Sequence, residues 1–593
     1  MPETTTAADL LLDILHDEWG VEVIFGLPGD GINGLMEALR KRQDRIRFVQ
    51  VRHEEAAAFM ACGYAKWTGR LGVCLATQGP GGLHLLNGLY DAKLDRQPVL
   101  ALTGLPYHDL IGTFTQQDVD LNVVFDNVSV YNARVMGPAH VENVTHLACR
   151  AAYGQRGVAH IAFPNSFQSM PVKGAERSAR NKPGHEAGNV NRPPVAVPGA
   201  AALRAAADVL NQGKRVFLLA GRGAQNATDV LQETADRLGA PIGKALLGKT
   251  VVPDDHPLTT GSVGFLGTDA SQAAMDACDT LLMVGTSFPY IEYLPKPGAA
   301  RCVQIDADPL RIGLRYPTEV GLVGDSRATL EALLPLLHRQ EDRAFLEETQ
   351  ANMATWREDL KAQAARREMP MKPQTVAEEL GKRLTDDAIF SADSGTASVW
   401  WARQIPARGT QKHSVSGLLA SMACGLPYAI AAQIAHPGRQ CVAFVGDGGM
   451  AMLMAEFKTA VQYRLPIKVV VLNNASYGFI RWEQMLNEGN PEFGVGFEGI
   501  DFAAFARACG GTGIRVEDPA ECGAALDRAF ATDGPVIVDA VVDPFEPPTP
   551  PKLSPEQARH FAEALEKGQE PRNVIEHSSL GEKAREQRAA VEE

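Results

Sequence analysis

The chain has 593 residues, of which 45% are hydrophobic and 22% charged, an ordinary balance for a globular protein of several domains. Its formal net charge of −14 argues against a nucleic-acid-binding protein, which needs clustered Lys and Arg on one face, and favours small-molecule partners. Nine scattered cysteines with no C-x-x-C pair predict neither a disulfide framework nor a zinc site, and so indicate a reducing compartment.

Residues 1–172 are predicted to form an α/β domain with a parallel sheet, because helical and strand patterns alternate. We expect helices over 7–19, 31–42 and 54–68, and strands within 23–29, 46–51, 72–79, 98–104 and 159–164. The N-terminus carries acidic residues in its apolar part and no basic stretch, and no window reaches the ~18–20 apolar residues of a membrane span. A cytoplasmic protein is expected.

Two further α/β units follow, which makes the predicted fold three doubly wound domains with parallel sheets. Residues 173–199 are polar and rich in Gly and Pro, which predicts a linker. The second domain is expected over 200–340, a charged helical linker over 341–369 and the third domain over 370–545. The tail, 546–593, is poor in large apolar residues and is expected to form a surface helix followed by disorder.

The third domain contains the most informative motif. Two apolar runs, 440–446 and 466–474, read as buried parallel strands joined by a crossover helix over 450–464. The first run closes with Gly-Asp-Gly at 446–448 and the second with Asn473 and Asn474, so Asp447 and Asn474 should meet at one sheet edge. A carboxylate and an amide oxygen suit Mg²⁺, and the glycines with the following helix start suit a diphosphate. The alternative is an ordinary strand-to-helix turn.

These residues resemble the signature of the thiamine diphosphate decarboxylase and oxidase superfamily, and the resemblance extends from about residue 5 to 555. It implies Mg²⁺ held by Asp447, Asn474 and the backbone oxygen of Ser476, with the cofactor diphosphate on the metal. It also implies that residues of this region contact the cofactor: Gly446, Asp447, Gly448, Gly449, Asn474, Ser476, Tyr477, Gly478, Phe479 and Ile480.

The first domain is expected to supply the other half of the site. The segment 52–55 leaves Glu54 and Glu55 as candidates near a helix start, where helix capping is the plain alternative, and the family pattern selects Glu54. In that family the glutamate binds the pyrimidine N1′ and assists deprotonation of the cofactor, and the two halves come from different subunits, which implies a homo-oligomer, with a dimer of dimers expected. The glycine-rich loop with Gly79, Pro80 and Gly81 resembles the cofactor-contacting loop of pyruvate oxidases.

Three further positions follow from the resemblance. Gln117 matches a substrate-facing glutamine, with Gln116 as the fallback and an exposed loop glutamine as the alternative. Met422 matches the apolar residue that props the bent cofactor, against a plain core methionine. Phe479 and Glu483 match pyruvate oxidases, in which the phenylalanine lies between thiazolium and flavin and the glutamate near the substrate, whereas acetolactate synthases usually have methionine and tryptophan there.

The second domain resembles the FAD-binding domain of pyruvate oxidases. The residues implied are Gly221, Arg222, Gly264, Phe265, Thr286, Ser287, Phe288, Pro289, Asp306, Ala307, Asp308, Ile312 and Asp325. Asp306 and Asp308 at a strand end could bind ribose or ribityl hydroxyls. A purely structural second domain is the alternative, since acetolactate synthases carry a flavin there without net redox use.

The resulting hypothesis is a pyruvate oxidase type enzyme that uses thiamine diphosphate, Mg²⁺ and FAD. It would decarboxylate pyruvate or a close 2-oxo acid oxidatively, transfer the acetyl group to phosphate or water, and pass electrons to oxygen or a quinone. A quinone-linked enzyme would be peripheral to the inner membrane, although the apolar face of 556–593 is narrow for lipid binding. A carboligase like acetolactate synthase is the runner-up, and a non-catalytic scaffold is a third possibility.

Overall fold

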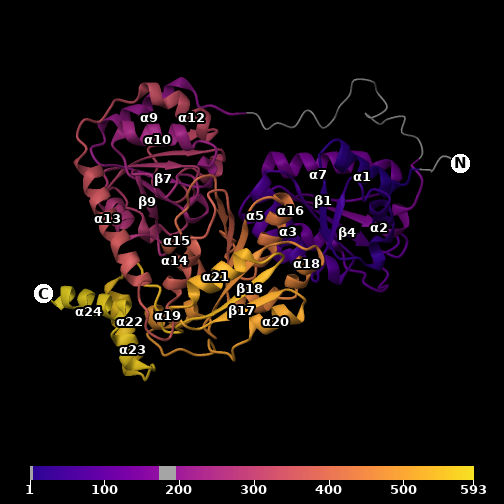
Figure 1. The fold of residues 1–593 in the computed structure, drawn as a ribbon. Coiled ribbons are helices and arrows are strands. Elements are labelled where there is room, and N and C mark those ends of the chain that lie inside the picture. The colour runs from indigo at the N-terminus through magenta and orange to yellow at the C-terminus, as the bar shows by residue number, and fades with distance from the viewer. Residues whose placement is uncertain (1–4, 173–194, 593) are drawn as a thin grey trace.

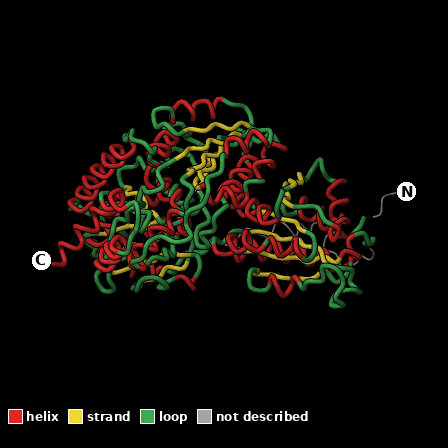
Figure 2. Tube along the Cα trace, turned by 90° about the horizontal axis from the view of Figure 1, so that it is seen from below, coloured by secondary structure: helices red, strands yellow, loops and turns green. Residues whose placement is uncertain are grey.

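The computed structural model describes residues 5–172 and 195–592, in which three six-stranded parallel sheets follow one another along the chain (Figure 1). Helices cover the faces of the sheets, and Figure 2 shows the strands in yellow between red helices. The prediction of three α/β domains is confirmed. Most of the predicted linker, residues 173–194, lies outside the described residues.

The first sheet has the strand order β2-β1-β3-β4-β6-β5. The strands are β1 (Val23–Gly26), β2 (Arg47–Gln50), β3 (Gly72–Ala76), β4 (Val99–Leu105), β5 (Ser129–Arg134) and β6 (Val158–Pro164). The helices are α1 (Ala7–Asp17), α2 (Asn33–Arg40), α3 (Glu54–Thr68), α4 (Pro80–His84), α5 (Leu86–Leu94), α6 (Leu121–Phe125), α7 (Val141–Gln155) and α8 (Asn165–Gln168). The apolar residues of β3 and β4 are buried on both faces, which is typical of a parallel sheet covered by helices.

The second sheet has the order β12-β11-β10-β7-β8-β9. Its strands are β7 (Val216–Ala220), β8 (Ile242–Lys244), β9 (Thr259–Ser262), β10 (Thr280–Val284), β11 (Arg301–Asp306) and β12 (Val320–Val323). The helices are α9 (Ala200–Gln212), α10 (Thr228–Leu238), α11 (Asp269–Ala277), α12 (Ser326–Leu333) and α13 (Ala344–Ala364). The two hydrophobic cores of this domain contain only residues between 203 and 346, so it packs around itself.

The third sheet has the order β14-β13-β15-β16-β18-β17. Its strands are β13 (Ile389–Ala392), β14 (Lys412–Ser414), β15 (Cys441–Gly446), β16 (Lys468–Asn473), β17 (Thr512–Val516) and β18 (Val536–Val541). Its helices are α14 (Pro373–Gly381), α15 (Thr396–Gln404), α16 (Gly425–Ala435), α17 (Asp447–Leu453), α18 (Glu456–Gln462), α19 (Gly478–Glu488), α20 (Phe502–Ala508) and α21 (Cys522–Ala531).

The first and third domains share one hydrophobic core. Phe59 and Trp67 of α3 lie in the same buried cluster as Tyr428 of α16, and the indole of Trp67 donates a 3.0 Å hydrogen bond to the carbonyl oxygen of Tyr428. Gly63 is required at this contact, because a Cβ there would lie 2.9 Å from the Tyr428 ring. In Figure 1 the two helices lie together at the junction of the domains.

The crossover helix predicted over 450–464 is divided in two. A turn at 454–455 separates α17 from α18, so that Glu456 begins the second helix. Its carboxylate accepts hydrogen bonds from the backbone N–H groups of Arg52 (2.8 Å) and His53 (3.0 Å) in the first domain. This contact between the first and third domains lies directly after the break in the predicted helix, and the local sequence pattern does not predict it.

The tail is helical, and the expectation of disorder after one surface helix is wrong. It forms α22 (Pro555–Glu566), α23 (Arg572–Glu576) and α24 (Ser579–Glu592), which lie beside α19 in Figure 1. A separate core explains the order, since Phe561 and Leu565 of the tail pack with Trp482 and Met485 of α19. Among the described residues, no helix has both the length and the apolarity required to cross a membrane.

Candidate active site

The ends of β15 and β16 bring Asp447 and Asn474 together, as the strand order predicts. The two strands are parallel neighbours in which Gly446 pairs with Leu472. The Asp447 carboxylate accepts hydrogen bonds from the backbone N–H groups of Asn474 (3.0 Å), Ala475 (2.6 Å) and Gly448 (2.8 Å). It therefore lies at the carboxyl edge of the sheet, where ligands bind in open α/β folds.

The surroundings of Asp447 suit a divalent cation. The residue is only 2% exposed, and this burial raises the pKa of its carboxyl group to about 6 despite the three N–H donors. The Asn474 side-chain oxygen accepts from the N–H of Ser476 at 3.1 Å, and the buried Ser476 hydroxyl has no hydrogen-bond partner among the described residues. The predicted donors, which are the Asp447 carboxylate, the Asn474 amide oxygen and the backbone oxygen of Ser476, are all oxygens and could hold Mg²⁺.

Glycines leave room for a ligand against this turn. A Cβ at Gly449 would lie 2.0 Å from a carboxylate oxygen of Asp393, and one at Gly448 would lie 2.5 Å from the Tyr477 ring and 3.3 Å from the methyl group of Met422. Around Gly446, by contrast, no other atom lies within 4 Å of the Cβ position, so the space over the turn is open. The glycine turn is thus tightly packed on the side that faces Asp393 and Tyr477 and open around Gly446, as a bound diphosphate requires.

A single cavity of about 1950 Å³ runs from this turn into the second domain. It exceeds the roughly 300–1,000 Å³ of an ordinary small-molecule pocket and has room for more than one cofactor. The predicted residues that line it are Gly221, Arg222, Phe265, Thr286, Ser287, Phe288, Pro289, Asp306, Ala307, Asp325, Met422, Gly446, Asp447, Gly448, Gly449, Asn474, Ser476, Tyr477, Gly478, Phe479, Ile480 and Glu483.

Two aromatic rings from different domains meet in the wall of the cavity. Phe479, near the start of α19, and Phe265 of the second domain have ring centroids 5.2 Å apart at an interplanar angle of 48°. Glu483 lies one turn further along α19, and burial raises the pKa of its carboxyl group. The pKa of Tyr290, which also lines the cavity, is raised mainly by burial and to a lesser extent by the negative charges of Glu292 and Glu483. A proton-accepting group thus lies beside the aromatic pair.

The second-domain end of the cavity is built on close backbone approaches. A Cβ at Gly221 would lie 2.4 Å from the carbonyl oxygen of Gly285, which itself has φ +59°. Asp306, at the end of β11, is buried, and burial raises the pKa of its carboxyl group. A ribityl or ribose hydroxyl could hydrogen-bond to this carboxyl group.

Three residues predicted to bind FAD do not line the cavity. The Asp308 carboxylate forms an ion pair of 2.8 Å with Arg96 of the first domain. Gly264 packs on Phe288, whose ring would lie 2.7 Å from an added Cβ, and Ile312 packs against Gly321 in the same way at 2.4 Å.

The first-domain candidates lie together, but they do not line the cavity of their own chain. Glu54 begins α3, is 6% exposed, and its carboxylate lies 3.0 Å from Nδ1 of His84. A Cβ at Gly81 would lie 3.2 Å from the Glu54 carboxylate, and Pro80 follows Gly79 at the start of α4. Gln117 has φ +61° and lies against Gly79, whose Cβ would be 2.8 Å from that of Gln117. The Gln117 side-chain oxygen is buried without a partner among the described residues, whereas Gln116 is exposed.

Sequence reasoning missed several residues at these places. His84 falls within the loop that was singled out, but nothing in one sequence marks it as the partner of Glu54. Lys552, Gln557 and His560 of the tail also line the cavity, because α22 packs on α19, and no local sequence signal predicts this. Each of the nine cysteines is a free thiol.

These observations define a three-domain thiamine diphosphate enzyme, and the chain belongs to the thiamine pyrophosphate enzyme family. It matches the N-terminal thiamine pyrophosphate binding domain of that family over 5–124, the central domain over 203–333 and the C-terminal thiamine pyrophosphate binding domain over 393–540. Among its relatives is YdaP of Bacillus subtilis, whose name describes a thiamine pyrophosphate-containing protein, with 40% identity over 94% of this chain and 95% of the relative.

Two relatives carry the names of different reactions. A pyruvate oxidase of Lactiplantibacillus plantarum is 33% identical over 93% of this chain and 91% of its own length. An acetolactate synthase of Mycobacterium bovis is 30% identical over 89% of this chain and 86% of its own length. The prediction of the superfamily is therefore confirmed, and the chain is a thiamine diphosphate-dependent enzyme related to enzymes of 2-oxo acids.

Proposed function

We propose that this protein is a pyruvate oxidase type enzyme, which uses thiamine diphosphate, Mg²⁺ and FAD to decarboxylate pyruvate or a close 2-oxo acid oxidatively. The observation that carries this proposal is the single cavity of about 1950 Å³ between the Asp447 turn and Asp306, with Phe479 and Phe265 in contact along its wall. A cavity of this extent supports a second cofactor, and Phe479 and Glu483, which match pyruvate oxidases, favour the oxidase over an acetolactate synthase that carries a flavin without net redox use.

The side chains suit these cofactors. Thiamine diphosphate supplies, when bound, a carbon nucleophile for decarboxylation, and FAD supplies an acceptor for two electrons. Asp447, Asn474 and Ser476 would hold Mg²⁺, and Met422 would support the aminopyrimidine. Glu483, whose pKa is raised by burial, can hold a proton near the substrate carbonyl or the acyl acceptor, which is phosphate or water.

A second copy of the chain completes the site in this proposal. Glu54, Gly79, Pro80, Gly81 and Gln117 lie outside the cavity of their own chain, so a neighbouring subunit would bring them to it. Glu54 would then exchange a proton with N1′ of the aminopyrimidine, and Gln117 would orient the substrate. Phe114, which is 99% exposed beside this group, suits burial between subunits. A dimer, or a dimer of such dimers, is proposed.

The flavin spectrum tests the redox assignment. The holoenzyme should be yellow, bleach anaerobically on addition of pyruvate, and regain its colour with oxygen or a soluble quinone. Acetate or acetyl phosphate should form in step with the acceptor that is reduced. A preparation that turns pyruvate over while its flavin stays oxidised would overturn the oxidase proposal.

A carboligase of the acetolactate synthase type is the second candidate, and the relative in Mycobacterium bovis supports it. It predicts one acetolactate for every two pyruvates and no consumption of an electron acceptor. Measuring acetolactate and acceptor reduction in the same reaction distinguishes the two functions.

A further inference from the structure

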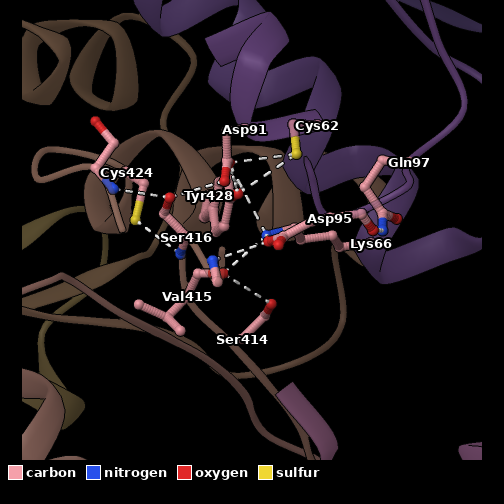
Figure 3. A network of polar contacts seen from close by, with 12 residues as sticks. Cys62, Lys66, Asp91, Asp95, Gln97, Ser414, Val415, Ser416, Cys424 and Tyr428 are labelled. Carbon is pink, nitrogen blue, oxygen red and sulfur yellow. Dashed lines mark hydrogen bonds and ion pairs between the residues drawn. The ribbon is translucent and has the colours of Figure 1, made fainter. Parts of the chain in front are cut away.

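A buried ionic network joins the first domain to the third (Figure 3). Lys66 of α3 lies 2.7 Å from the carboxylate of Asp95 and 3.9 Å from that of Asp91, and the three side chains are at most 2% exposed. The Lys66 ammonium also donates a 2.8 Å hydrogen bond to the carbonyl oxygen of Val415 in the third domain. Buried charges are costly unless they are fully paired, so this network must be satisfied by the surrounding chain.

Asp95, which follows α5, anchors a loop of the third domain. One carboxylate oxygen accepts the backbone N–H of Gly417 at 2.9 Å, and the other accepts that of Leu418 at 3.0 Å. A larger residue at Gly417 would displace its neighbours, because a Cβ there would lie 2.5 Å from Leu247 and 2.7 Å from the Asp95 carboxylate. The loop is therefore fitted closely to the carboxylate of another domain.

Asp91, within α5, anchors the same loop at a second point. Its carboxylate accepts the hydroxyl of Ser416 at 2.8 Å, and that hydroxyl accepts the N–H of Ser421 at 2.9 Å. The hydroxyl of Tyr428 and, at 3.4 Å, the thiol of Cys62 also point to Asp91. In Figure 3 these groups surround the carboxylate from both domains.

The loop needs such anchors because its backbone is strained. Ala420 has φ +55° and Ala423 has φ +73°, values that residues other than glycine seldom adopt. Such a strained backbone conformation persists only where the surroundings enforce it. The N–H of Ala423 donates a 3.0 Å hydrogen bond to Asp393, so the loop is held at this end as well.

Met422 lies between these two strained residues. Its methyl group packs over the Asp447 turn, 3.3 Å from the Cβ position of Gly448. Other residues of the loop, including Gly417 and Leu418, line the same cavity. The position of this cavity wall therefore depends on carboxylates in the first domain.

We propose that Asp91 and Asp95 are positioning residues of the cofactor site, which hold the loop over residues 416–424 so that Met422 supports the aminopyrimidine of thiamine diphosphate. The inference rests on the thiamine diphosphate site proposed above. Each first domain then serves two sites: Asp91 and Asp95 shape the site of their own chain, and Glu54 completes that of the neighbour. Asp95 is suited to this role as a charged acceptor. Burial alone would raise the pKa of its carboxyl group, but Lys66 and the N–H groups of the loop outweigh burial and hold that pKa below its usual value.

The variant Asp95→Asn tests the proposal. Its amide group would face Lys66 or a loop N–H, so the loop should lose an anchor. We expect the Kd of thiamine diphosphate, measured by calorimetry with Mg²⁺, to rise at least tenfold. The Kd of inorganic pyrophosphate with Mg²⁺ should stay within about twofold, because Asp447 and Asn474 bind that half and remain intact.

The matched control is Asp254→Asn, since Asp254 is also a carboxylate between domains and its side chain is only 13% exposed. It pairs with Lys244 at 2.6 Å and accepts the N–H of Ala407 at 2.7 Å, away from the loop. This variant should leave the Kd of both ligands unchanged. Equal weakening of both ligands in Asp95→Asn would mean general damage and would overturn the positioning role.

A double-mutant cycle decides whether Asp95 acts through Met422. Met422→Ala should weaken thiamine diphosphate binding by a similar factor, and the double variant should be no weaker than the worse single one. If the two increases in the Kd of thiamine diphosphate multiply in the double variant, or if Asp95→Asn leaves that Kd unchanged, the inference is refuted. Should that variant not fold, Ser416→Ala removes only the hydroxyl that links Asp91 to Ser421, with the same outcomes. Failure of the unaltered protein to bind thiamine diphosphate would instead refute the proposed function.

Discussion

Replacing Asp447 by asparagine should stabilise the protein without its cofactor and abolish the stabilisation that Mg²⁺ and thiamine diphosphate confer. In the folded chain, burial raises the pKa of Asp447 from 3.8 to about 6, so its charged form is disfavoured. The cost is fully present above pH 6 and is relieved as the pH falls towards 3.8, where the unfolded chain also takes up the proton. The cation would remove the same cost by binding the carboxylate.

The magnitude follows from the shift and from the hydrogen bonds. About two pKa units correspond to about 3 kcal/mol at 1.36 kcal/mol per unit. An asparagine keeps one acceptor oxygen but directs its amide group at a backbone N–H, which costs about 1–2 kcal/mol. The net gain should be about 1–2 kcal/mol. The first and third domains share one core and should unfold together, so their common Tm should rise by about 1–3 °C, because a unit larger than about 250 residues shifts by less than roughly 2–4 °C per kcal/mol.

Thermal unfolding between pH 5 and 8, with and without Mg²⁺ and thiamine diphosphate, measures both effects. The difference between variant and unaltered protein cancels groups that titrate equally in both, such as Asp393, whose pKa burial also raises to about 6. The Tm of the apo variant should exceed that of the unaltered apoprotein at pH 7.5, and this difference in Tm should vanish or reverse near pH 5. A variant less stable than the unaltered apoprotein at pH 7.5, or a difference independent of pH, would refute this account of Asp447.

Three further predictions concern the assembly, the aromatic pair and the tail. Mixing the inactive variants Glu54→Gln and Asp447→Asn, with dissociation and reassembly, should restore about one quarter of the activity, because half of the dimers are mixed and each contains one intact site. Phe479→Ala should slow anaerobic flavin reduction by pyruvate in stopped-flow spectroscopy, and Phe265→Ala should do so to a lesser degree, with decarboxylation in the presence of ferricyanide retained. Phe561→Ala should cost about 3–5 kcal/mol locally and expose 555–592 to proteolysis, while the first two domains stay protected.

Each of these can fail in a distinct way. No recovery on mixing would mean that one chain carries a whole site. Flavin reduction at an unchanged rate in Phe479→Ala would place the aromatic pair outside the route between cofactors. Equal protection of the tail in Phe561→Ala would mean that its helices do not depend on packing against α19.

The sequence predicted the site best at the ends of β15 and β16, where the possible metal ligands Asp447 and Asn474 directly follow apolar runs. The runs before Asp447 and Asn474 are apolar apart from Gln440 and Lys468, which predicts buried strands, and a parallel βαβ unit brings their ends together. The edge strand β5 was missed because its six residues are all half-buried and show no apolar pattern. The three-residue strand β8 is too short for any periodic signal.

Contacts between domains were beyond the sequence. The ring contact of Phe265 with Phe479 and the hydrogen bonds of Asp95 with the N–H groups of Gly417 and Leu418 join residues far apart in the chain, and no spacing marks either contact. The tail was misjudged for the same reason, because its few apolar residues suffice only when α19 offers Trp482 and Met485 as partners. The contacts between domains and the order of the tail depend on packing between elements far apart in the sequence, and such packing leaves no pattern in the local sequence.

The shared core of α3 and α16 limits how this enzyme can be recombined. A chimera that exchanges only the second domain with that of a relative would keep the two buried cores of that domain, which lie between 203 and 346. It would have to match only the contacts at the border of that domain, such as Phe265 on Phe479 and Leu247 on the shared core. A splice that took the first domain from one parent and the third from another would have to match Trp67 and Gly63 against a foreign Tyr428. The outer two domains are therefore inherited as a pair, and the second domain is the module open to replacement.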